Sequence, residues 1–184
     1  MCGIVGFIGN EQAAPILLEG LSRLEYRGYD SAGLAVYDAQ AGLQVSKAKG
    51  RLKALYDLTH GGADVKGTMG VGHTRWATHG EPNDVNSHPQ VSQSGRVAVV
   101  HNGIIENYVR LKEFLMEKGV RFVSETDTEV VAQLVDYYYQ GDLLEAVAQV
   151  LKVIEGAYAL GIVCADEPDK IVAARKDAPL LLGY

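Results

Sequence analysis

The order in which extended and helical patterns follow one another is the feature that most restricts the fold of this sequence. Segments 34–38 and 43–49 both read as strands and flank AQAG, as in a hairpin. Three helical patterns then follow one another without a strand between them, over 105–119, 126–141 and 142–156. A doubly wound parallel sheet needs strands and helices in alternation. This order therefore favours an α+β fold of antiparallel sheets with helices on the outside.

The remaining elements are predicted from apolar periodicity and from turn residues. A capping-box-like pair, Thr126 and Glu129, marks the start of the helix over 126–141. The other expected elements are a buried strand at 3–9, a helix within 11–26, turn chemistry at 27–33, a short helix at 51–59, central strands at 69–77 and 96–103 on either side of a polar loop at 78–95, and two or three strands within 157–184.

Composition excludes several classes of function. A chain of 184 residues suits one sizeable domain, and its net charge of −6 argues against nucleic acid or an anionic membrane surface as a partner. No apolar stretch approaches the roughly 20 residues that a membrane span needs, and no signal peptide is indicated. The two cysteines make no disulfide framework, and Cys164 reads as a buried, inert thiol. The expected location is the cytoplasm.

The other cysteine, Cys2, lies directly behind the initiator methionine, in MCGIVGFIG. Cys2 could simply be a small residue that begins a strand. Alternatively, removal of Met1 would give Cys2 both a thiol and a free α-amine. Gly3, Gly6 and Gly9 do not have the G-x-G-x-x-G spacing of a dinucleotide site, so we set that reading aside.

Polar residues are concentrated in HTRWATHG at 73–80. Arg75 follows a strand pattern, where a guanidinium suits bidentate capture of a carboxylate, although a lone arginine is more often a salt-bridged surface residue. A metal site is the rival reading for the histidines. They have no H-x-x-x-H spacing on a helix and no paired cysteines, so we expect no metal at His73, His79, His88 and His101.

Two further motifs each have a functional and a structural reading. Asn102-Gly103 could be a hairpin turn, but a helical pattern follows at once. The alternative is an oxyanion hole, because an Asn amide and a Gly backbone N–H can donate together to a tetrahedral oxygen. Asp127, in SETDTE at 124–129, is either a favourable partner of a helix dipole or a carboxylate presented to a substrate ammonium.

These motifs occur together and in order along the chain. The sequence resembles the glutaminase domain of the class II glutamine amidotransferases, which are N-terminal nucleophile hydrolases, and the resemblance spans nearly the whole chain. Within that class it is most similar to the glutamine–fructose-6-phosphate aminotransferases, on the evidence of Tyr26 and Tyr29. The motifs that carry the resemblance are CGIVG at 2–6, RGYDSAG at 27–33, HTRWATHG at 73–80, HNGIIEN at 101–107 and SETDTE at 124–129.

The resemblance implies a four-layer α/β/β/α sandwich of two antiparallel sheets and a set of residue roles. Cys2 would be the nucleophile, with its own α-amine as base, and Asn102 and Gly103 would form the oxyanion hole. The implied substrate is L-glutamine, with no cofactor and no metal. In the substrate pocket, Arg75 would hold the α-carboxylate, Asp127 the α-ammonium, Trp76, Thr78 and His79 would line the walls, and Arg27 would support the N-terminus.

The resemblance also says what lies outside the chain. Residues 1–184 would form the glutaminase domain, and full-length relatives would continue into sugar-isomerase domains, form homodimers and make glucosamine 6-phosphate from fructose 6-phosphate. Two alternatives stay open. One is the glutaminase domain of an amidophosphoribosyltransferase-type enzyme, and the other is a non-catalytic module that senses glutamine.

Overall fold

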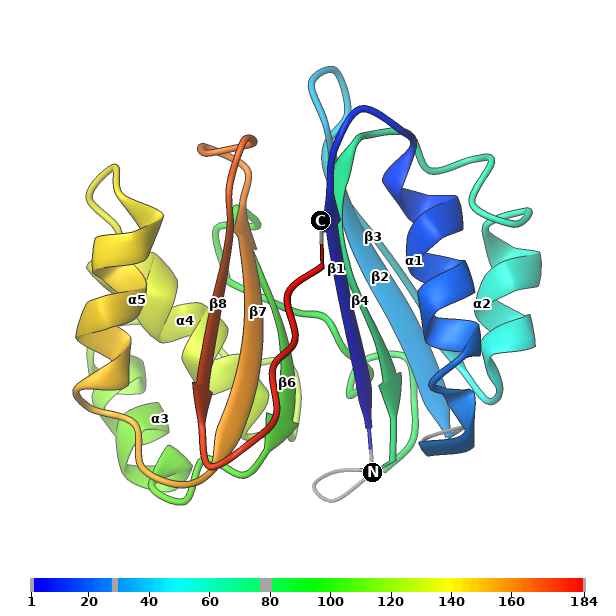
Figure 1. The fold of residues 1–184 in the computed structure, drawn as a ribbon. Helices are drawn as coiled ribbons and strands as arrows, with labels where there is room; N and C mark the ends of the chain where they lie inside the picture. Colours follow the sequence, from blue (N-terminus) through cyan, green and yellow to red (C-terminus); the bar gives the residue numbers. More distant parts are fainter. Residues whose placement is uncertain (1, 28–29, 77–80, 184) are drawn as a thin grey trace.

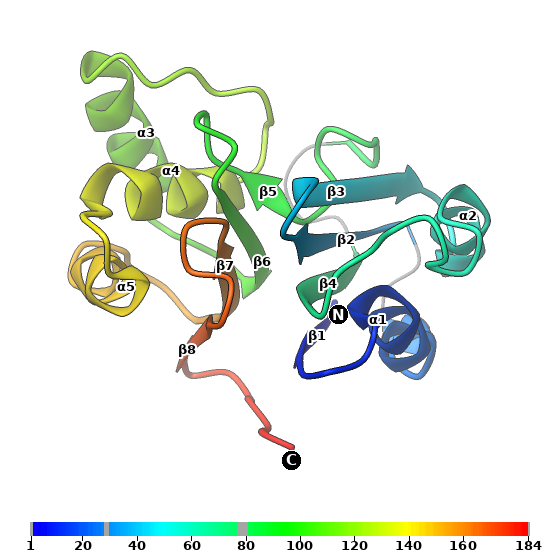
Figure 2. The same ribbon diagram turned by 90° about the horizontal axis from the view of Figure 1, so that it is seen from above.

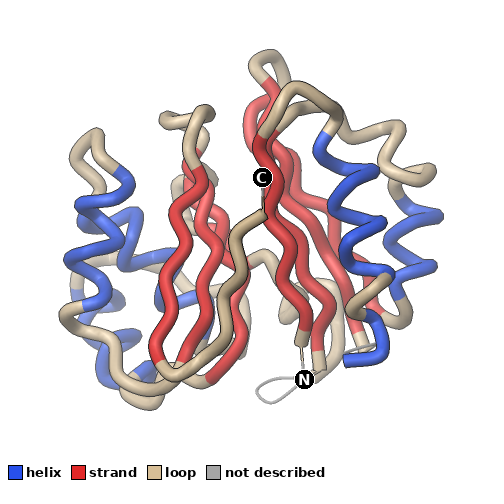
Figure 3. Tube along the Cα trace, viewed as in Figure 1, coloured by secondary structure: helices blue, strands red, loops and turns tan. Residues whose placement is uncertain are grey.

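Two antiparallel sheets lie face to face, and helices cover their outer faces. The computed structural model describes residues 2–27, 30–76 and 81–183. Figure 1 shows the four layers in order, helices, sheet, sheet and helices, and Figure 3 shows the same layers coloured by secondary structure. The expected α+β sandwich of four layers is confirmed.

The first sheet has the strand order β1-β4-β2-β3, so the two strands nearest the N-terminus are not neighbours. Helices α1 (Ala13–Ser22) and α2 (Leu52–Leu58) pack on it through buried leucines such as Leu17, Leu21 and Leu55. The strands are β1 (Gly3–Ile8), β2 (Ser31–Asp38), β3 (Gly42–Lys49) and β4 (Met69–Arg75).

The second sheet has the order β5-β6-β7-β8, and its helical layer holds the largest buried cluster of apolar side chains. The central helix of that layer is α4, whose residues from Thr128 to Val135 are all buried. The elements are β5 (Gln90–Val91), β6 (Val97–Gly103), α3 (Tyr108–Glu117), α4 (Thr128–Tyr138), α5 (Leu143–Leu151), β7 (Tyr158–Cys164) and β8 (Ile171–Lys176).

The layer between the two sheets is apolar in its middle and polar where β4 and β6 end. Figure 2 shows the two sheets side by side, seen from above. Apolar residues including Met69, Val71 and Val100 fill the middle of this layer. Side chains on one face of a strand recur every second residue, so β4 carries His73 and then Arg75 beyond Val71 on the same face. The apolar interior therefore passes into a polar region where β4 and β6 end.

Four local expectations are wrong, each for a physical reason. The strand at 3–9 is not buried, because β1 lies at the edge of its sheet and only Gly3 of its residues is buried. The turn chemistry at 27–33 is partly strand, because β2 begins at Ser31; Gly33 is needed for a close backbone approach, since a Cβ there would lie 2.1 Å from the His88 carbonyl oxygen. Helix α4 begins at Thr128, not Thr126, because the Glu129 carboxylate accepts from the Val123 and Ser124 amides. The polar loop at 78–95 contains the short strand β5.

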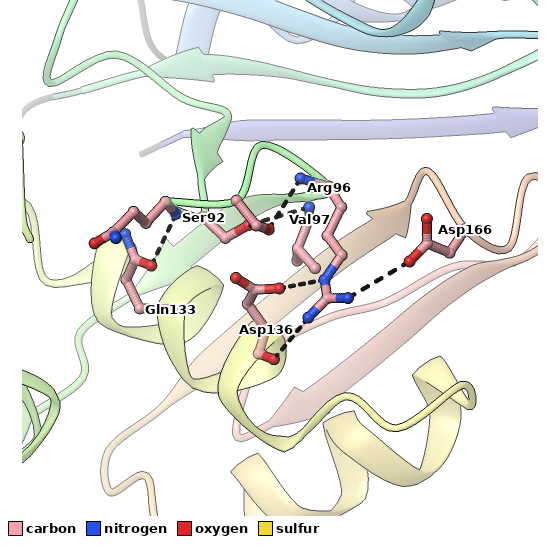
Figure 4. A network of polar contacts seen from close by, with 8 residues as sticks. Ser92, Arg96, Val97, Gln133, Asp136 and Asp166 are labelled. Atoms are coloured by element: carbon pink, nitrogen blue, oxygen red, sulfur yellow. Dashed lines mark hydrogen bonds and ion pairs between the residues drawn. The ribbon is translucent and has the colours of Figure 1, made fainter. Parts of the chain in front are cut away.

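A polar clamp fixes the end of β6 that lies away from this region (Figure 4). The Arg96 guanidinium pairs with the carboxylate of Asp136 on α4 and, at 3.6 Å, with that of Asp166 in the turn between β7 and β8. The Ser92 hydroxyl accepts from the Val97 amide at 3.3 Å, closing the β5–β6 turn. The clamp holds α4 against the second sheet.

No helix of the described residues is long and apolar enough to cross a membrane.

Two histidines buried between the sheets predict how stability depends on pH. Burial lowers the pKa of His73 to about 3 and lowers the pKa of His88 well below its ordinary value. An unfolded histidine has a pKa of about 6.5, so below that pH the unfolded chain binds more protons than the folded chain. The free energy of unfolding should therefore fall as pH falls, by about 1.4 kcal/mol per histidine between pH 7.5 and 5.5.

Urea unfolding at several pH values within this window tests the expectation. His88→Gln should weaken the pH dependence, because it removes one of the buried titrating histidines. The exposed pair His60–Asp64 raises the pKa of His60 and acts in the opposite direction, so His60→Gln should steepen the dependence. Equal stability at pH 7.5 and 5.5 in the parent protein would contradict the assignment of neutral buried histidines.

Candidate active site

Cys2 lies beside the last residues of β4. In the antiparallel register Gly3 is opposite Thr74, so the residue before β1 meets the residues that end β4. The Cys2 Sγ accepts a hydrogen bond from the Trp76 backbone N–H at 3.1 Å and lies 3.5 Å from the Trp76 carbonyl oxygen. Burial raises the pKa of the thiol, and the Trp76 N–H and Arg75 oppose that rise. A base is therefore needed to form the thiolate at neutral pH.

Asn102 reaches Cys2 from the opposite sheet. Its side chain, near the end of β6, donates from Nδ2 to the Cys2 carbonyl oxygen at 3.1 Å. Its Oδ1 lies 2.9 Å from the Nε2 of His73 on β4. The Asn102 amide thus spans the gap between the sheets at the end where Cys2 lies.

Gly103 is a position that only glycine can occupy. Its φ is +121°, and a Cβ there would lie 2.1 Å from the Ala157 carbonyl oxygen. The hairpin reading of Asn102-Gly103 is wrong, because β6 pairs with β5 and β7 and the chain runs on into α3. The backbone at Ile104 instead donates to Ala157 O at 3.1 Å.

Arg75 carries a buried cation into the same region. Only 4% of its surface is exposed, and one guanidinium nitrogen lies 3.5 Å from the Glu81 carbonyl oxygen. Burial lowers the pKa of Arg75, and the neighbouring Asp30, Cys2 and Asp127 oppose that change. The thiol and the two carboxylates therefore lie near enough to stabilise the cation electrostatically.

Asp127 occupies the N-cap position of α4 without capping the helix through its side chain. It is 4% exposed, and its Oδ2 accepts from the Ile105 backbone N–H at 2.8 Å. The carboxylate thus links the start of α4 to the chain just beyond Gly103. The Asp127 carboxylate therefore binds the backbone at Ile105 in addition to lying at the start of the helix.

The segment that carries Asp127 is held from the outside by the loop that follows residue 80. Asn86 accepts from the Glu125 N–H at 2.9 Å and donates to the Glu125 carboxylate at 3.1 Å. On the inner side, the buried carboxylate of Glu129 accepts from the Ser124 N–H at 2.6 Å. Asp127 is therefore positioned by contacts on both sides.

Of the other expected site residues, Trp76 lies within the described residues. Trp76 is 47% exposed, and its backbone N–H donates to the Cys2 Sγ. Thr78 and His79 lie outside the described residues, and so does the side chain of Arg27, whose backbone belongs to the 3₁₀ turn Glu25–Arg27. The structure therefore brings together Cys2, Arg75, Asn102, Gly103 and Asp127.

Sequence reasoning missed two neighbours of this cluster. Asp30 precedes β2, and its amide donates to the Arg75 carbonyl oxygen at 3.2 Å. His73 contacts Asn102 directly. The signal for His73 is its two-residue spacing from Arg75 on one strand, which puts both side chains on one face.

A metal site and a surface depression are the other features to consider among the described residues. No group of three or more His, Cys, Asp or Glu side chains in the described ranges could hold a metal ion. A depression of about 450 Å³ is lined by residues of α4, α5 and their connection, such as Tyr138 and Glu145, and offers no nucleophile. We therefore base the candidate site on the chemistry around Cys2.

Comparison with known proteins shows the family to which the chain belongs. A family model described as a glutamine amidotransferase domain matches residues 73–182. The glutamine–fructose-6-phosphate aminotransferase (isomerizing) of Caldanaerobacter subterraneus subsp. tengcongensis is 64% identical over 183 residues, which is 100% of this chain and 30% of the relative. The chain thus spans under a third of the length of such relatives.

Solved structures give the same family. The allosteric regulatory enzyme of purine biosynthesis matches with a TM-score of 0.80 and 30% identity, over 95% of this chain and 37% of that one. Glutamine phosphoribosylpyrophosphate amidotransferase from B. subtilis matches with a TM-score of 0.77 and 30% identity, over 90% of this chain and 35% of that one. The chain therefore belongs to the class II glutamine amidotransferase domain family, and its fold is that of the N-terminal nucleophile hydrolases.

Proposed function

We propose that this domain hydrolyses the side-chain amide of L-glutamine, with Cys2 as the nucleophile after Met1 has been removed. The observation that carries the proposal is the position of Cys2, whose thiol accepts from the Trp76 N–H of its own sheet and whose backbone carbonyl oxygen accepts from the Asn102 amide of the other sheet. A primary amide is a poor electrophile. Its hydrolysis needs a strong nucleophile and donors for the developing oxyanion, which Cys2 and the Asn102-Gly103 pair would supply.

The base in this proposal is the α-amine of Cys2 itself. A free thiol has a pKa of about 8.5 and an α-amine one of about 7.7–8.0, so a proton can pass between them near neutral pH. Burial raises the pKa of this thiol, which makes a nearby base necessary. The Trp76 N–H, which donates to Sγ, stabilises the thiolate once it forms. An internal cysteine would have no such amine.

The thiolate attacks the side-chain carbonyl carbon, and the charge moves to its oxygen. The Asn102 amide has two N–H groups; one contacts Cys2 O, and the other is available for the oxyanion, with the Gly103 N–H as the second donor. The ammonium of Cys2 returns its proton to the departing nitrogen, the C–N bond breaks and ammonia leaves. Water, deprotonated by the same amine, then cleaves the γ-glutamyl thioester to glutamate and the free thiol.

The proposed substrate pocket binds both charged groups of the amino-acid head group. Arg75, a buried cation, would pair with the α-carboxylate, and Asp127, a buried carboxylate, with the α-ammonium. An amide lacking either charge would leave a buried partner unsatisfied, which selects glutamine over simple amides. Trp76, Thr78 and His79 would line the pocket and Arg27 would support the N-terminus, as the family resemblance implies.

In a full-length protein, we propose that the ammonia is used to make glucosamine 6-phosphate from fructose 6-phosphate. The relative with 64% identity carries the name of that aminotransferase, whereas the phosphoribosylpyrophosphate amidotransferase structure is 30% identical. Residues 1–184 would then be the glutaminase domain, followed by sugar-isomerase domains in a cytoplasmic homodimer. This difference in identity favours the sugar acceptor over a phosphoribosyl one.

The first prediction concerns the nucleophile. Mature protein should release glutamate and ammonia from glutamine, and Cys2→Ala should abolish release because no thioester can form. Cys164→Ala is the matched control, since that thiol is fully buried in β7 and should be dispensable for turnover. An electrophilic glutamine analogue should add one adduct to the parent protein and none to Cys2→Ala, as intact mass will show. Normal turnover by Cys2→Ala would exclude the mechanism.

The second prediction concerns recognition of the α-carboxylate. Arg75→Lys keeps the charge and loses the planar fork, so kcat/KM for glutamine should fall about 10- to 100-fold, in keeping with a lost charged hydrogen bond. Most of the loss should lie in KM, because the head group binds equally in ground and transition states. Arg96→Lys, in the clamp of Figure 4, is the control and should leave both constants unchanged. Unaltered kinetics in Arg75→Lys would remove Arg75 from the pocket.

A further inference from the structure

His73 makes two polar contacts through a single nitrogen atom. Its Nε2 lies 3.0 Å from the His101 carbonyl oxygen and 2.9 Å from the Asn102 Oδ1. The side chain is fully buried on the face of β4 that looks toward the second sheet. It lies next to the candidate site through Asn102, and among the described residues it makes no hydrogen bond to Cys2.

The chemistry of these partners fixes which groups donate. A backbone carbonyl oxygen can only accept, so the contact with His101 O requires a proton on Nε2 of His73. The same N–H of His73 also donates to Asn102, so the Asn102 atom next to it must be the amide oxygen. The NH₂ group of Asn102 is then turned toward Cys2, where it donates to the carbonyl oxygen. The reverse amide orientation would place the Asn102 Oδ1 against the Cys2 carbonyl oxygen, and two acceptors cannot form a hydrogen bond.

Burial keeps the ring neutral, and packing against His88 holds it in place. Burial lowers the pKa of His73 to about 3, although the bond to Asn102 acts in the opposite direction. The His88 ring packs against it with centroids 4.3 Å apart. His88 is itself anchored, because its Nδ1 accepts from the His101 N–H at 3.4 Å. His73 therefore serves as a fixed hydrogen-bond donor and not as a proton carrier.

The other ring nitrogen shows that packing alone does not explain a histidine here. His73 Nδ1 is buried and has no hydrogen-bond partner among the residues that the structure describes. Burying a polar atom without a partner is unfavourable, and an apolar side chain of similar size would avoid that cost. The benefit that offsets this cost is the bond that Nε2 makes.

We infer that His73 is a positioning residue that orients the Asn102 amide, so that its N–H groups face the carbonyl oxygen of a substrate attacked by Cys2. The inference rests on the proposed function for its catalytic consequence, and on the described contacts for its geometry. It adds to the site a residue that touches neither substrate nor nucleophile. Its effect should appear in kcat and pass entirely through Asn102.

Kinetics of two variants separate positioning from packing. His73→Leu removes the donor and should lower kcat by about tenfold or more, up to the 10²–10³ typical of a lost oxyanion donor, with little change in KM. His73→Gln can place an amide N–H near the former Nε2 and should recover most of that loss. His60→Leu, at an exposed histidine after α2, is the matched control and should keep the parent kcat. Equal losses in His73→Leu and His73→Gln would overturn the inference.

A double-mutant cycle with Asn102→Ala tests whether the effect passes through that amide. Once Asn102 is gone, His73→Leu should lower kcat by less than twofold further, because there is no amide left to orient. The same fold loss in both backgrounds would show that His73 acts by another route. Urea unfolding of each variant identifies any that fail to fold, and His73→Gln then carries the kinetic comparison.

An activity-independent measurement keeps this inference separable from the proposed function. With ¹⁵N-labelled asparagine, the Asn102 side-chain amide should give one ordered pair of protons, protected from exchange, in the parent protein and in His73→Gln. In His73→Leu the protection should fall at least tenfold. Unchanged protection would overturn the inference even if glutamine is hydrolysed. Lost protection in a protein that never hydrolyses glutamine would uphold the geometry and reject the proposed function.

Discussion

The antiparallel pairing of β1 with β4 is the constraint on which the rest of the site depends. It places Gly3 opposite Thr74, and so puts the residue before Gly3 beside Arg75 and Trp76. The fit is close, because a Cβ at Gly3 would lie 2.7 Å from the Leu24 Cβ and 2.8 Å from the Thr74 Oγ1. A shift of one residue would turn His73 and Arg75 away from the second sheet and bury the wrong face. The cluster around Cys2 thus follows from a register that packing enforces.

The second constraint is the graded interior between the sheets. Apolar side chains such as Val71 and Val100 hold the sheets together, and the same two strands then present His73, Arg75 and Asn102 at their ends. Most polar groups at such a depth are paired, and bonds of Asn102 to His73 and Cys2 cross between the sheets. The packing of the sandwich therefore also sets the distances within the site. Arg96, at the far end of β6, holds the second sheet to its helices without entering the site.

Sequence reasoning reached most of the architecture because it depends on local patterns. The order of strands and helices indicated outward helices and antiparallel sheets, and the motifs indicated Cys2, Asn102 and Asp127. What it missed depends on contacts between segments distant in the chain. Gly33 was read as a turn residue, yet it allows the close approach of the His88 backbone from a loop more than fifty residues on. The contact of His73 with Asn102 joins two sheets, and no local periodicity encodes how two sheets are aligned.

The central claim is that Cys2 uses its own α-amine as the base. The most direct test compares two preparations of the same mature protein, one with a free amine on Cys2 and one with that nitrogen acetylated, both with the thiol intact by titration. We predict that the acetylated protein loses glutamine hydrolysis near neutral pH while it still binds glutamine. Equal rates of glutamate release from the two preparations would contradict the account.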